Sequence, residues 1–282
     1  MQTASVDRAT RFLIALVGTW GAACQSQSPP PLAEPTRMVS PETSSGERQA
    51  AVRALPPPSA VLELFTSEGC SSCPAADETL ARLTDEAAER GARVFTLELH
   101  VDYWNDLGWV DRFSDRAYSQ RQNAYARRLS EGQVYTPQLI VNGRRQLVGS
   151  NGTAARAAVA EALRAPAQAT VAVTARAVAA GIEVSYRVAA PGPVDLQLAV
   201  ADDAAETQVR AGENAHQRLR HRHVVRAFRT LRVAGESQGT WLSAWPAVGQ
   251  HPATFVAAYA TEPTTLQVLG ADALSLSASE AG

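Results

Sequence analysis

Apolar positions follow two different periods between residues 60 and 100. Nearly continuous apolar runs at residues 60–66 and 94–99 are typical of buried parallel strands. The segment between them, residues 71–90, carries apolar side chains at helical spacing, with Pro74 in the first turn and Gly91 directly after the end. A strand–helix–strand connection of this length is a right-handed crossover, so both strands should end at the same edge of one sheet.

The pattern continues with a second helix, a hairpin and a third helix. A helical period runs over residues 111–130, and a further helix is predicted over residues 151–165. Asn142 and Gly143 stand between two short apolar runs, which is the strongest short-range signal for a β-hairpin. The order strand, helix, strand, helix, hairpin, helix predicts an α/β domain over residues 59–166.

From residue 169 onward the pattern changes to short strands. Alternating or apolar stretches recur at roughly ten-residue spacing and are separated by Gly, Pro and Asp. They lie at residues 170–176, 182–188, 194–201, 207–210, 219–228, 254–260 and 266–269. This pattern predicts an all-β, sandwich-like domain over residues 169–273, followed by a disordered tail at residues 274–282.

The N-terminal part of the chain lacks the packing pattern of a domain. Residues 1–24 combine Arg8 and Arg11 with a short apolar run and small residues, as in an export signal peptide. Cys24 directly follows Gly-Ala-Ala and resembles the acylated cysteine of a bacterial lipoprotein, while ordinary secretory cleavage near this point is the alternative. Residues 25–58, rich in Ser, Pro, Gln and Glu, predict a flexible linker. We therefore expect export to the periplasm, where an acylated Cys24 would anchor the protein to the outer membrane.

Composition and charge limit the classes of partner. The chain has 282 residues, of which 45% are hydrophobic, and a formal net charge of −2. This length allows about two domains. The near-neutral charge gives no bias toward nucleic acid or a membrane surface. We therefore expect no nucleic acid as partner, and membrane contact only through the lipid anchor.

Cys70 and Cys73 are the strongest candidates for chemistry. They follow the first predicted strand and open the first predicted helix. Such a pair can be a structural disulfide, half of a metal site or a redox-active dithiol. A zinc site needs about four ligands, and a crosslink across so short a loop stabilises a fold least. A strand that leads through Cys-x-x-Cys into a helix favours redox use, as in thioredoxin-type proteins.

Thr136 and Pro137 precede the first strand of the predicted hairpin. In thioredoxin-like folds a proline at this place is cis and faces the dithiol. We therefore expect a cis Thr136–Pro137 bond that presents the Thr136 backbone to a substrate strand beside the sulfurs. An ordinary trans proline at a strand start is the alternative. Thr136, Pro137 and Glu68, which lies in the turn before Cys70, are assigned to substrate binding.

A polar and aromatic segment follows the second predicted strand. His100 and Asp102 come at the carboxyl end of that strand, where open α/β sheets place ligands. They could move protons or tune a thiolate, and a capping or loop-packing role fits equally well. Trp104 is assigned to packing beside the site.

An arginine- and histidine-rich stretch lies in the predicted β domain. Residues 210–232 contain seven arginines and a single acidic residue, Glu213. His221 and His223 share one strand face, which we interpret as solvated. An acidic partner or a weak metal site is the alternative. Because both histidines belong to the second predicted domain, they are not expected to complete a metal site with the cysteines.

Several motifs together resemble one known family. They are Phe65-Thr66-Ser67-Glu68-Gly69-Cys70-Ser71-Ser72-Cys73-Pro74, His100-Val101-Asp102-Tyr103-Trp104 with Leu107-Gly108-Trp109, Val134-Tyr135-Thr136-Pro137-Gln138, Gly212-Glu213-Asn214 and His223-Val224-Val225-Arg226. On these motifs, residues 60–269 resemble the secreted, thioredoxin-like family DUF1223. The resemblance implies a thioredoxin-like domain followed by a β domain. It implies no established activity, because the family is uncharacterised.

The sequence thus predicts an exported thiol–disulfide oxidoreductase, built as an α/β thioredoxin-like domain followed by an all-β, sandwich-like domain. Cys70 would attack or be attacked, and Cys73 would resolve the mixed disulfide. The partners would be protein thiols or disulfides, and neither a cofactor nor a metal is expected. The alternative is a non-catalytic binding module, in which the disulfide is structural or the dithiol takes up a soft metal such as Cu(I). An exposed dithiol beside a cis proline would favour the first, and a buried one the second.

Metabolic labelling tests the predicted anchor. A palmitate analogue should tag the wild-type protein in the bacterial cell and leave the Cys24→Ser variant untagged, because the acyl chains are added to the cysteine that follows the cleavage site. The Cys70→Ser variant is the matched control and should label like the wild type. Recovery of exported, unlabelled wild-type protein that begins beyond Cys24 would discard the anchor.

Overall fold

The computed structural model describes residues 56–244 and 253–277. Cys24, the predicted signal peptide and most of the predicted linker lie outside these ranges. The described helical segments are α1 (Pro74–Glu89), the 3₁₀ helix η1 (Asp102–Leu107), α2 (Arg116–Leu129) and α3 (Gly152–Ala162). None of them combines the length and the apolar character needed to cross a membrane.

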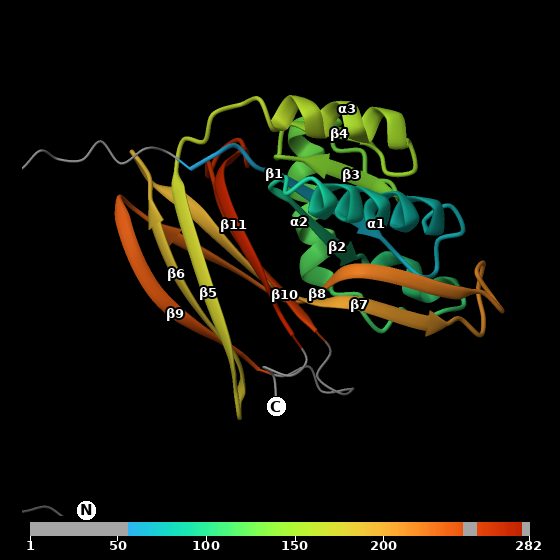
Figure 1. The fold of residues 1–282 in the computed structure, drawn as a ribbon. Helices are drawn as coiled ribbons and strands as arrows, with labels where there is room; N and C mark the ends of the chain where they lie inside the picture. Colours follow the sequence, from blue (N-terminus) through green and yellow to red (C-terminus); the bar gives the residue numbers. More distant parts are fainter. Residues whose placement is uncertain (1–55, 245–252, 278–282) are drawn as a thin grey trace, which may run out of the picture. The chain divides into compact units, whose positions relative to one another are not determined.

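Eight strands form one large mixed sheet (Figure 1). In spatial order they are β11 (Val268–Leu276), β10 (Thr254–Thr261), β7 (Val194–Gln208), β8 (Arg218–Val233), β2 (Val94–His100), β1 (Ala60–Thr66), β3 (Gln138–Val141) and β4 (Arg145–Val148). Strands β1 and β2 are parallel, as predicted. Strand β8 joins the other edge of β2, also in parallel, with Val224 opposite Glu98.

The predicted fold class, an α/β thioredoxin-like domain followed by an all-β sandwich-like domain, is wrong. The described part of the protein is mostly β, with eleven strands, and the N-terminal and C-terminal halves share the large sheet. The reason lies in β7 and β8. The sequence suggested separate strands at residues 194–201 and 207–210, but they form one 15-residue strand whose pairing with β8 contains a bulge. Strand β8 of this long pair lies beside β2, so the C-terminal strands continue the sheet that β1 and β2 begin.

A second sheet of three strands packs on one end of the large sheet. It consists of β5 (Thr170–Val178), β6 (Gly181–Ala189) and β9 (Glu236–Ala244). Val173 and Ile182 of this sheet share a core with Leu196 of β7 and Val256 of β10. Strand β9 is an element that the sequence pattern did not predict, and its side chains alternate between exposed and half-buried along most of its length.

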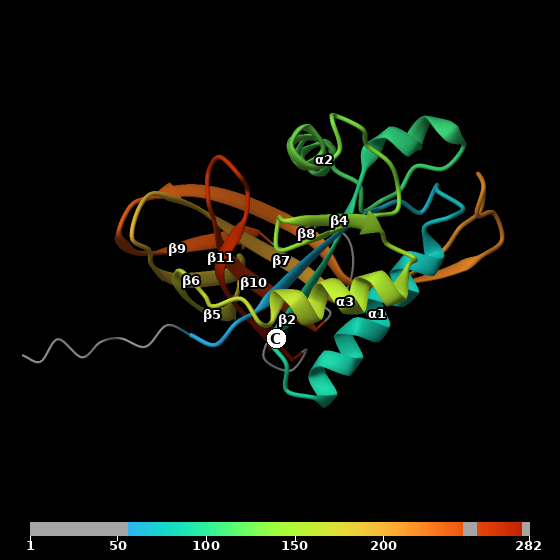
Figure 2. The same ribbon diagram turned by 90° about the horizontal axis from the view of Figure 1, so that it is seen from above.

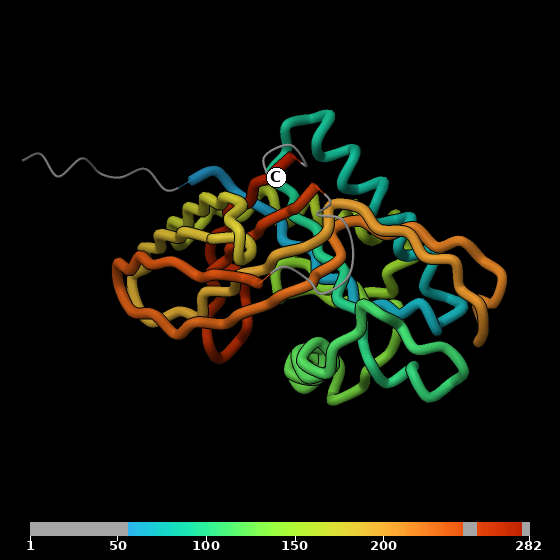
Figure 3. Tube along the Cα trace, turned by 90° about the horizontal axis from the view of Figure 1, so that it is seen from below, coloured from blue at the N-terminus to red at the C-terminus, as the bar shows by residue number. Residues whose placement is uncertain are grey.

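Helices cover both faces of the other end of the large sheet. Side chains alternate along β1, so Leu62 and Leu64 pack under α1 and α3, while Val61 and Phe65 face α2. Figures 2 and 3 show α2 on one side of β1 and β2 and α1 on the other, and Figure 2 shows α3 on the same side as α1. The core under α2 continues to Phe255 of β10, so it spans both halves of the chain.

The predicted hairpin at Asn142 and Gly143 is confirmed between β3 and β4. Residues 142–144 connect the paired residues Val141 and Arg145, and the Arg144 backbone N–H donates to the Val141 carbonyl at 3.0 Å. Asn142 and Gly143 are the central residues of this turn and both have positive φ, 49° and 64°. The Asn142 side chain also accepts a hydrogen bond from the Val61 backbone N–H at 2.6 Å. A Cβ atom at position 143 would lie 2.1 Å from the Leu266 carbonyl oxygen, so only glycine fits here.

A buried ion pair connects β1 with α2 and β10. Glu63 of β1 is 1% exposed. Arg121 donates to its two carboxylate oxygens, from Nε at 2.5 Å and from Nη2 at 3.1 Å. The hydroxyls of Tyr125 and Tyr259 donate to the same carboxylate, at 2.5 and 2.9 Å. The buried negative charge is therefore both paired and hydrogen-bonded, which is the condition for its burial in a stable fold.

Removal of Arg121 should destabilise the fold strongly. The Arg121→Leu variant should lose about 3–5 kcal/mol of unfolding free energy, because it leaves the Glu63 carboxylate buried without its cation. Urea unfolding followed by circular dichroism measures this loss. Arg127 is an exposed arginine on the same helix, and Arg127→Leu should stay within about 0.5 kcal/mol of the wild type. Equal effects of the two substitutions would contradict the role given to the ion pair.

Candidate functional site

Cys70 and Cys73 form a disulfide in the turn that leads from β1 into α1. Their Cα atoms lie 5.4 Å apart. Helix α1 begins at Pro74 with Cys73 as its N-cap, so it starts later than the predicted residue 71. Both cysteines are buried, at 1% and 0% exposure, so exposure does not single out Cys70. Ser71 and Ser72 between them are exposed, which places the disulfide next to the surface.

Thr136 and Trp104 lie beside the disulfide. The Thr136–Pro137 peptide bond is cis, as predicted. The Thr136 hydroxyl donates to Cys70 Sγ at 3.4 Å, and the Trp104 indole N–H donates to that hydroxyl oxygen at 2.9 Å. The structure therefore brings together Cys70, Thr136 and Trp104, three residues that the sequence assigned to one site.

The loop between β7 and β8 closes over the Cys-x-x-Cys turn from the other half of the chain. The buried Asn214 side chain donates from Nδ2 to the backbone carbonyls of Glu68 and Cys70, at 2.9 and 3.0 Å. The Glu213 carboxylate accepts a hydrogen bond from the Ser71 backbone N–H at 3.0 Å. Sequence reasoning assigned no role at the site to either residue. The Glu213 carboxylate also puts a negative charge near Cys70, which opposes a thiolate there.

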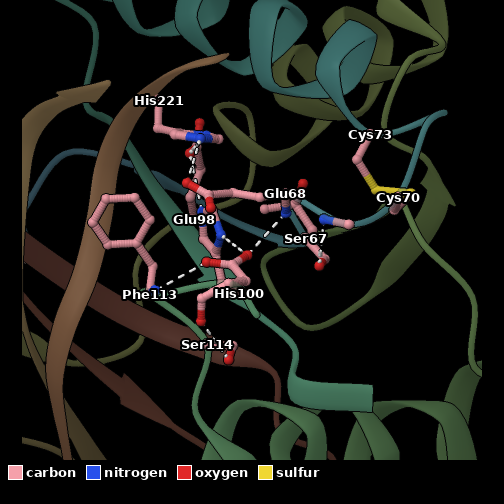
Figure 4. A network of polar contacts seen from close by, with 12 residues as sticks. Ser67, Glu68, Cys70, Cys73, Glu98, His100, Phe113, Ser114 and His221 are labelled. Atoms are coloured by element: carbon pink, nitrogen blue, oxygen red, sulfur yellow. Dashed lines mark hydrogen bonds and ion pairs between the residues drawn. A yellow bond between two sulfur atoms is a disulfide. The ribbon is translucent and has the colours of Figure 1, made fainter. Parts of the chain in front are cut away.

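A buried polar cluster lies on the inner side of this turn (Figure 4). All of its members are at most 2% exposed, and they are Glu68, Asp77, Glu98, His100, Asp111 and His221. They come from the turn after β1, from α1, β2 and β8, and from the loop between η1 and α2. The sequence had placed two of these residues, Glu68 and His100, at the site.

Asp111 orients His100 within the cluster. His100 Nδ1 lies 2.7 Å from Asp111 Oδ2, and the same oxygen accepts the Glu68 backbone N–H at 2.8 Å. Asp102, which the sequence placed beside His100, instead accepts a hydrogen bond from the Ser119 hydroxyl at 2.5 Å and so connects η1 with α2. Figure 4 shows the polar contacts that join His100 to the turn bearing Glu68.

His221 brings β8 against the carboxylates of the cluster. Its Nδ1 atom lies 3.2 Å from Glu98 Oε2 and 3.5 Å from Asp77 Oδ2, and its Nε2 atom lies 3.7 Å from Glu68 Oε1. The interpretation of His221 and His223 as a solvated strand face is wrong, because they are 2% and 5% exposed. Pairing of β8 with β2 buries His221 beside Asp77 of α1, and His223 stacks on Phe255 of β10.

Burial and neighbouring charges shift the pKa values of several groups in this cluster, and for the two imidazoles these two effects oppose each other. Burial raises the pKa of Asp77 to about 7, and the Glu98 carboxylate adds to that shift. Burial lowers the pKa of His100, but the Asp111 carboxylate outweighs it and raises that pKa to about 9. Burial also lowers the pKa of His221, whereas Glu68 and Glu98 bring it well above the ordinary imidazole value. Without a bound cation, the carboxylates thus favour a positive charge on both imidazoles.

Glu68, assigned to substrate binding from the sequence, is buried in the cluster. Its Oε2 atom accepts a hydrogen bond from the Trp109 indole N–H at 2.7 Å. The sequence also contains a pattern that could have predicted this cluster. Thr96, Glu98 and His100 occupy every second position of a strand that is otherwise apolar, so one buried face of β2 is polar.

Asn214 should control how readily the disulfide opens. Asn214→Ala removes both hydrogen bonds to the Cys-x-x-Cys turn. At about 1 kcal/mol for each hydrogen bond, dithiothreitol should reduce the disulfide roughly thirtyfold faster. Stopped-flow alkylation of the released thiols measures the rate. Arg210, exposed near the same loop, provides the control, and Arg210→Ala should leave the rate unchanged. An unchanged rate in Asn214→Ala would show that this loop does not restrain the disulfide.

Comparisons with known proteins identify a family without an established activity. Protein AGR_C_4864 from Agrobacterium tumefaciens has a similar structure, with a TM-score of 0.60, 28% identity and coverage of 78% of this chain and 96% of that chain. HBP35 of Porphyromonas gingivalis shares the fold, with a TM-score of 0.60, 18% identity and coverage of 79% of this chain and 77% of that chain. No curated protein matches the chain. Residues 61–259 match the family described as "Protein of unknown function (DUF1223)", and this chain therefore belongs to the DUF1223 family.

Proposed function

We propose that this protein exchanges disulfides with protein thiols through Cys70 and Cys73. The observation that carries the proposal is the position of the disulfide. It lies next to exposed Ser71 and Ser72, directly before a helix, with the Thr136 hydroxyl 3.4 Å from Cys70 Sγ. Disulfide exchange requires in-line attack of a thiolate on one of the two sulfurs, and a surface turn of this kind can present a sulfur to a partner.

The exchange begins when a partner thiolate attacks Cys70 Sγ. The partner sulfur bonds to Cys70, the Cys70–Cys73 bond breaks, and its electron pair leaves with Cys73 as a thiolate, which then takes up a proton. A second partner thiolate attacks the partner sulfur of the mixed disulfide and releases the Cys70 thiolate. The partner is oxidised by two electrons and this protein is reduced by two. The same steps in reverse reduce a partner disulfide, so the redox state of the partner determines the direction.

Cys70 is the sulfur that would form the mixed disulfide. It contacts the side chains of Thr136 and Ser72, at 3.4 and 3.3 Å, whereas Cys73 is the N-cap of α1. The positive end of the α1 dipole would stabilise the departing Cys73 thiolate. The backbone of Thr136 and Pro137 would hold an extended partner chain beside Cys70.

The second candidate function is a non-catalytic binding module with a structural disulfide. The burial of both cysteines favours it, since neither exceeds 1% exposure. The hydrogen bonds from Asn214 and the nearby Glu213 carboxylate also hold the turn closed and disfavour a thiolate. In this case the reduced dithiol could still take up a soft ion such as Cu(I).

We propose further that the protein works outside the cytoplasm, as its N-terminal sequence suggests. A disulfide persists in an oxidising compartment such as the periplasm. The acylated Cys24 and the linker at residues 25–58 would hold the disulfide near the outer membrane, where its partners would be other exported proteins with thiols or disulfides.

The reduction potential distinguishes the two candidate functions. Equilibration of the full chain in glutathione or dithiothreitol buffers, followed by alkylation, should give a potential between about −120 and −270 mV if the disulfide is redox-active. The protein should also accelerate oxidation of a dithiol peptide. Cys70→Ser should abolish that activity, and Cys24→Ser should retain it. A potential below about −300 mV, which is typical of structural disulfides, would exclude the exchange reaction.

A further inference from the structure

We propose that Glu98, His100 and His221 bind one divalent transition-metal ion, of which Zn²⁺ is the best match. Each residue offers one ligand atom, and these atoms all lie within 4.8 Å of one another. The three side chains are buried and project from neighbouring strands β2 and β8 of the large sheet. This site is independent of the disulfide and goes beyond the proposed exchange reaction.

Unpaired polar atoms converge on this point. Within the described ranges, five cluster atoms have no hydrogen-bond partner, and they are Glu68 Oε1, Glu98 Oε2, His100 Nε2, His221 Nδ1 and His221 Nε2. Buried polar atoms are almost always hydrogen-bonded, so several unpaired atoms in one cluster need an explanation. A bound cation would explain them, because Glu98, His100 and His221 bring their ligand atoms within 4.8 Å of one another, and Figure 4 shows these side chains gathered with Glu68 in one cluster.

The contacts of His100 fit a metal ligand. Ionised Asp111 can only accept hydrogen bonds, so the 2.7 Å contact requires the proton on His100 Nδ1. His100 Nε2 then faces Glu98 Oε2 at 3.7 Å, which is too long for a hydrogen bond. Histidine ligands commonly donate their other N–H to a carboxylate, which fixes the ring and strengthens the ligand. Asp111 is the residue in this protein that would position the ligand in that way.

The carboxylate of Glu98 accepts a hydrogen bond on one oxygen, while its other oxygen accepts none and faces the two imidazoles. Its Oε1 atom accepts the Arg222 backbone N–H at 3.1 Å. Its Oε2 atom faces His100 Nε2 at 3.7 Å and His221 Nδ1 at 3.2 Å. Zinc bonds of about 2.0–2.2 Å place two ligand atoms about 3.4 Å apart in a tetrahedron. The two separations that involve Glu98 bracket that value, and all three ligand atoms lie within 4.8 Å of one another, so side-chain movements on binding would have to close the set.

Charge and access agree with a cation. Within the cluster, the carboxyl groups of Glu68, Asp77, Glu98 and Asp111 outnumber the two imidazoles, and a divalent cation would offset the excess. Asp77 Oδ2, 3.5 Å from His221 Nδ1, could supply a fourth ligand. Asp77 and His221 also lie at the wall of a groove of about 950 Å³ between α1 and the β7–β8 hairpin, which is the side of the cluster nearest to solvent. Nitrogen and oxygen donors without a thiolate suit Zn²⁺ or Co²⁺ better than a soft ion.

Metal titration of the full chain tests the site. The disulfide is kept oxidised and Cys24 is blocked with iodoacetamide, so that none of the three cysteines of the chain offers a thiolate. Added Co²⁺ should bind one ion per chain with visible d–d bands, and Zn²⁺ should displace it and raise the melting temperature. Loss of an outer-sphere group typically lowers metal affinity roughly 10–100-fold. Glu98→Gln and His221→Gln should each lower the affinity for Co²⁺ by more than that, because each removes a direct ligand. His216→Ala, which removes an exposed histidine near the same strand, should bind like the wild type.

Three results would overturn the proposal. The first is a wild-type protein without saturable one-to-one binding of Co²⁺ or Zn²⁺, which needs no variant and so does not depend on variant folding. The second is unchanged affinity in folded Glu98→Gln and His221→Gln proteins. The Cys70→Ser/Cys73→Ser double variant should keep its metal affinity, and loss of binding there would transfer the site to the cysteines. The reduction potential of the disulfide does not affect any of these metal-binding results. The proposed disulfide exchange and the proposed metal site can therefore fail independently.

Discussion

The parallel pairing of β8 with β2 is the contact on which the functional region of this protein depends. It places Val224 opposite Glu98, and the Arg222 backbone N–H donates to the Glu98 side chain. The pairing brings His221 into the polar cluster, and the β7–β8 hairpin carries Asn214 onto the Cys-x-x-Cys turn. Both candidate sites are therefore assembled from two distant parts of the chain across one sheet.

The protein buries charge in two different ways. Around Glu63, one arginine and two tyrosine hydroxyls satisfy the carboxylate, and the network connects β1, α2 and β10. In the cluster around Glu98, several carboxylate and imidazole atoms lie close together without hydrogen bonds within the described chain. A fully satisfied network stabilises a fold, whereas a partly satisfied one is costly unless it serves a ligand. This contrast is why we assign a structural role to the first and a binding role to the second.

The Cys-x-x-Cys turn combines features with opposite consequences for reactivity. The start of α1 and the Thr136 hydroxyl suit a sulfur that exchanges. The Glu213 carboxylate and the two hydrogen bonds from Asn214 hold the turn closed and make a thiolate less favourable. Exchange would therefore require the β7–β8 loop to loosen, so the C-terminal half of the chain would regulate the chemistry of the N-terminal half.

Local sequence chemistry was enough to predict the strand, the Cys-x-x-Cys turn and the helix that follows it. The hairpin at Asn142 and Gly143 was predictable for the same reason, because positive φ at both positions favours those two residues. The alternation of apolar residues also located most of the strands. Each of these features depends on neighbours in the sequence, whose preferences can be read without knowledge of the fold.

Tertiary structure alone decided how these elements join and which residues form the buried cluster. Glu98 and Arg222 are 124 positions apart, and no periodicity indicates that their strands pair. The joining of β8 to β2 made the large sheet continuous and turned His221 from an apparent surface residue into a buried one. Short motifs do not specify loop geometry, and in this protein the loop after η1 places Asp111 rather than Asp102 beside His100. Pattern reasoning identifies which face of a strand is polar, but the strand that packs beside it is selected by the packing of the whole core.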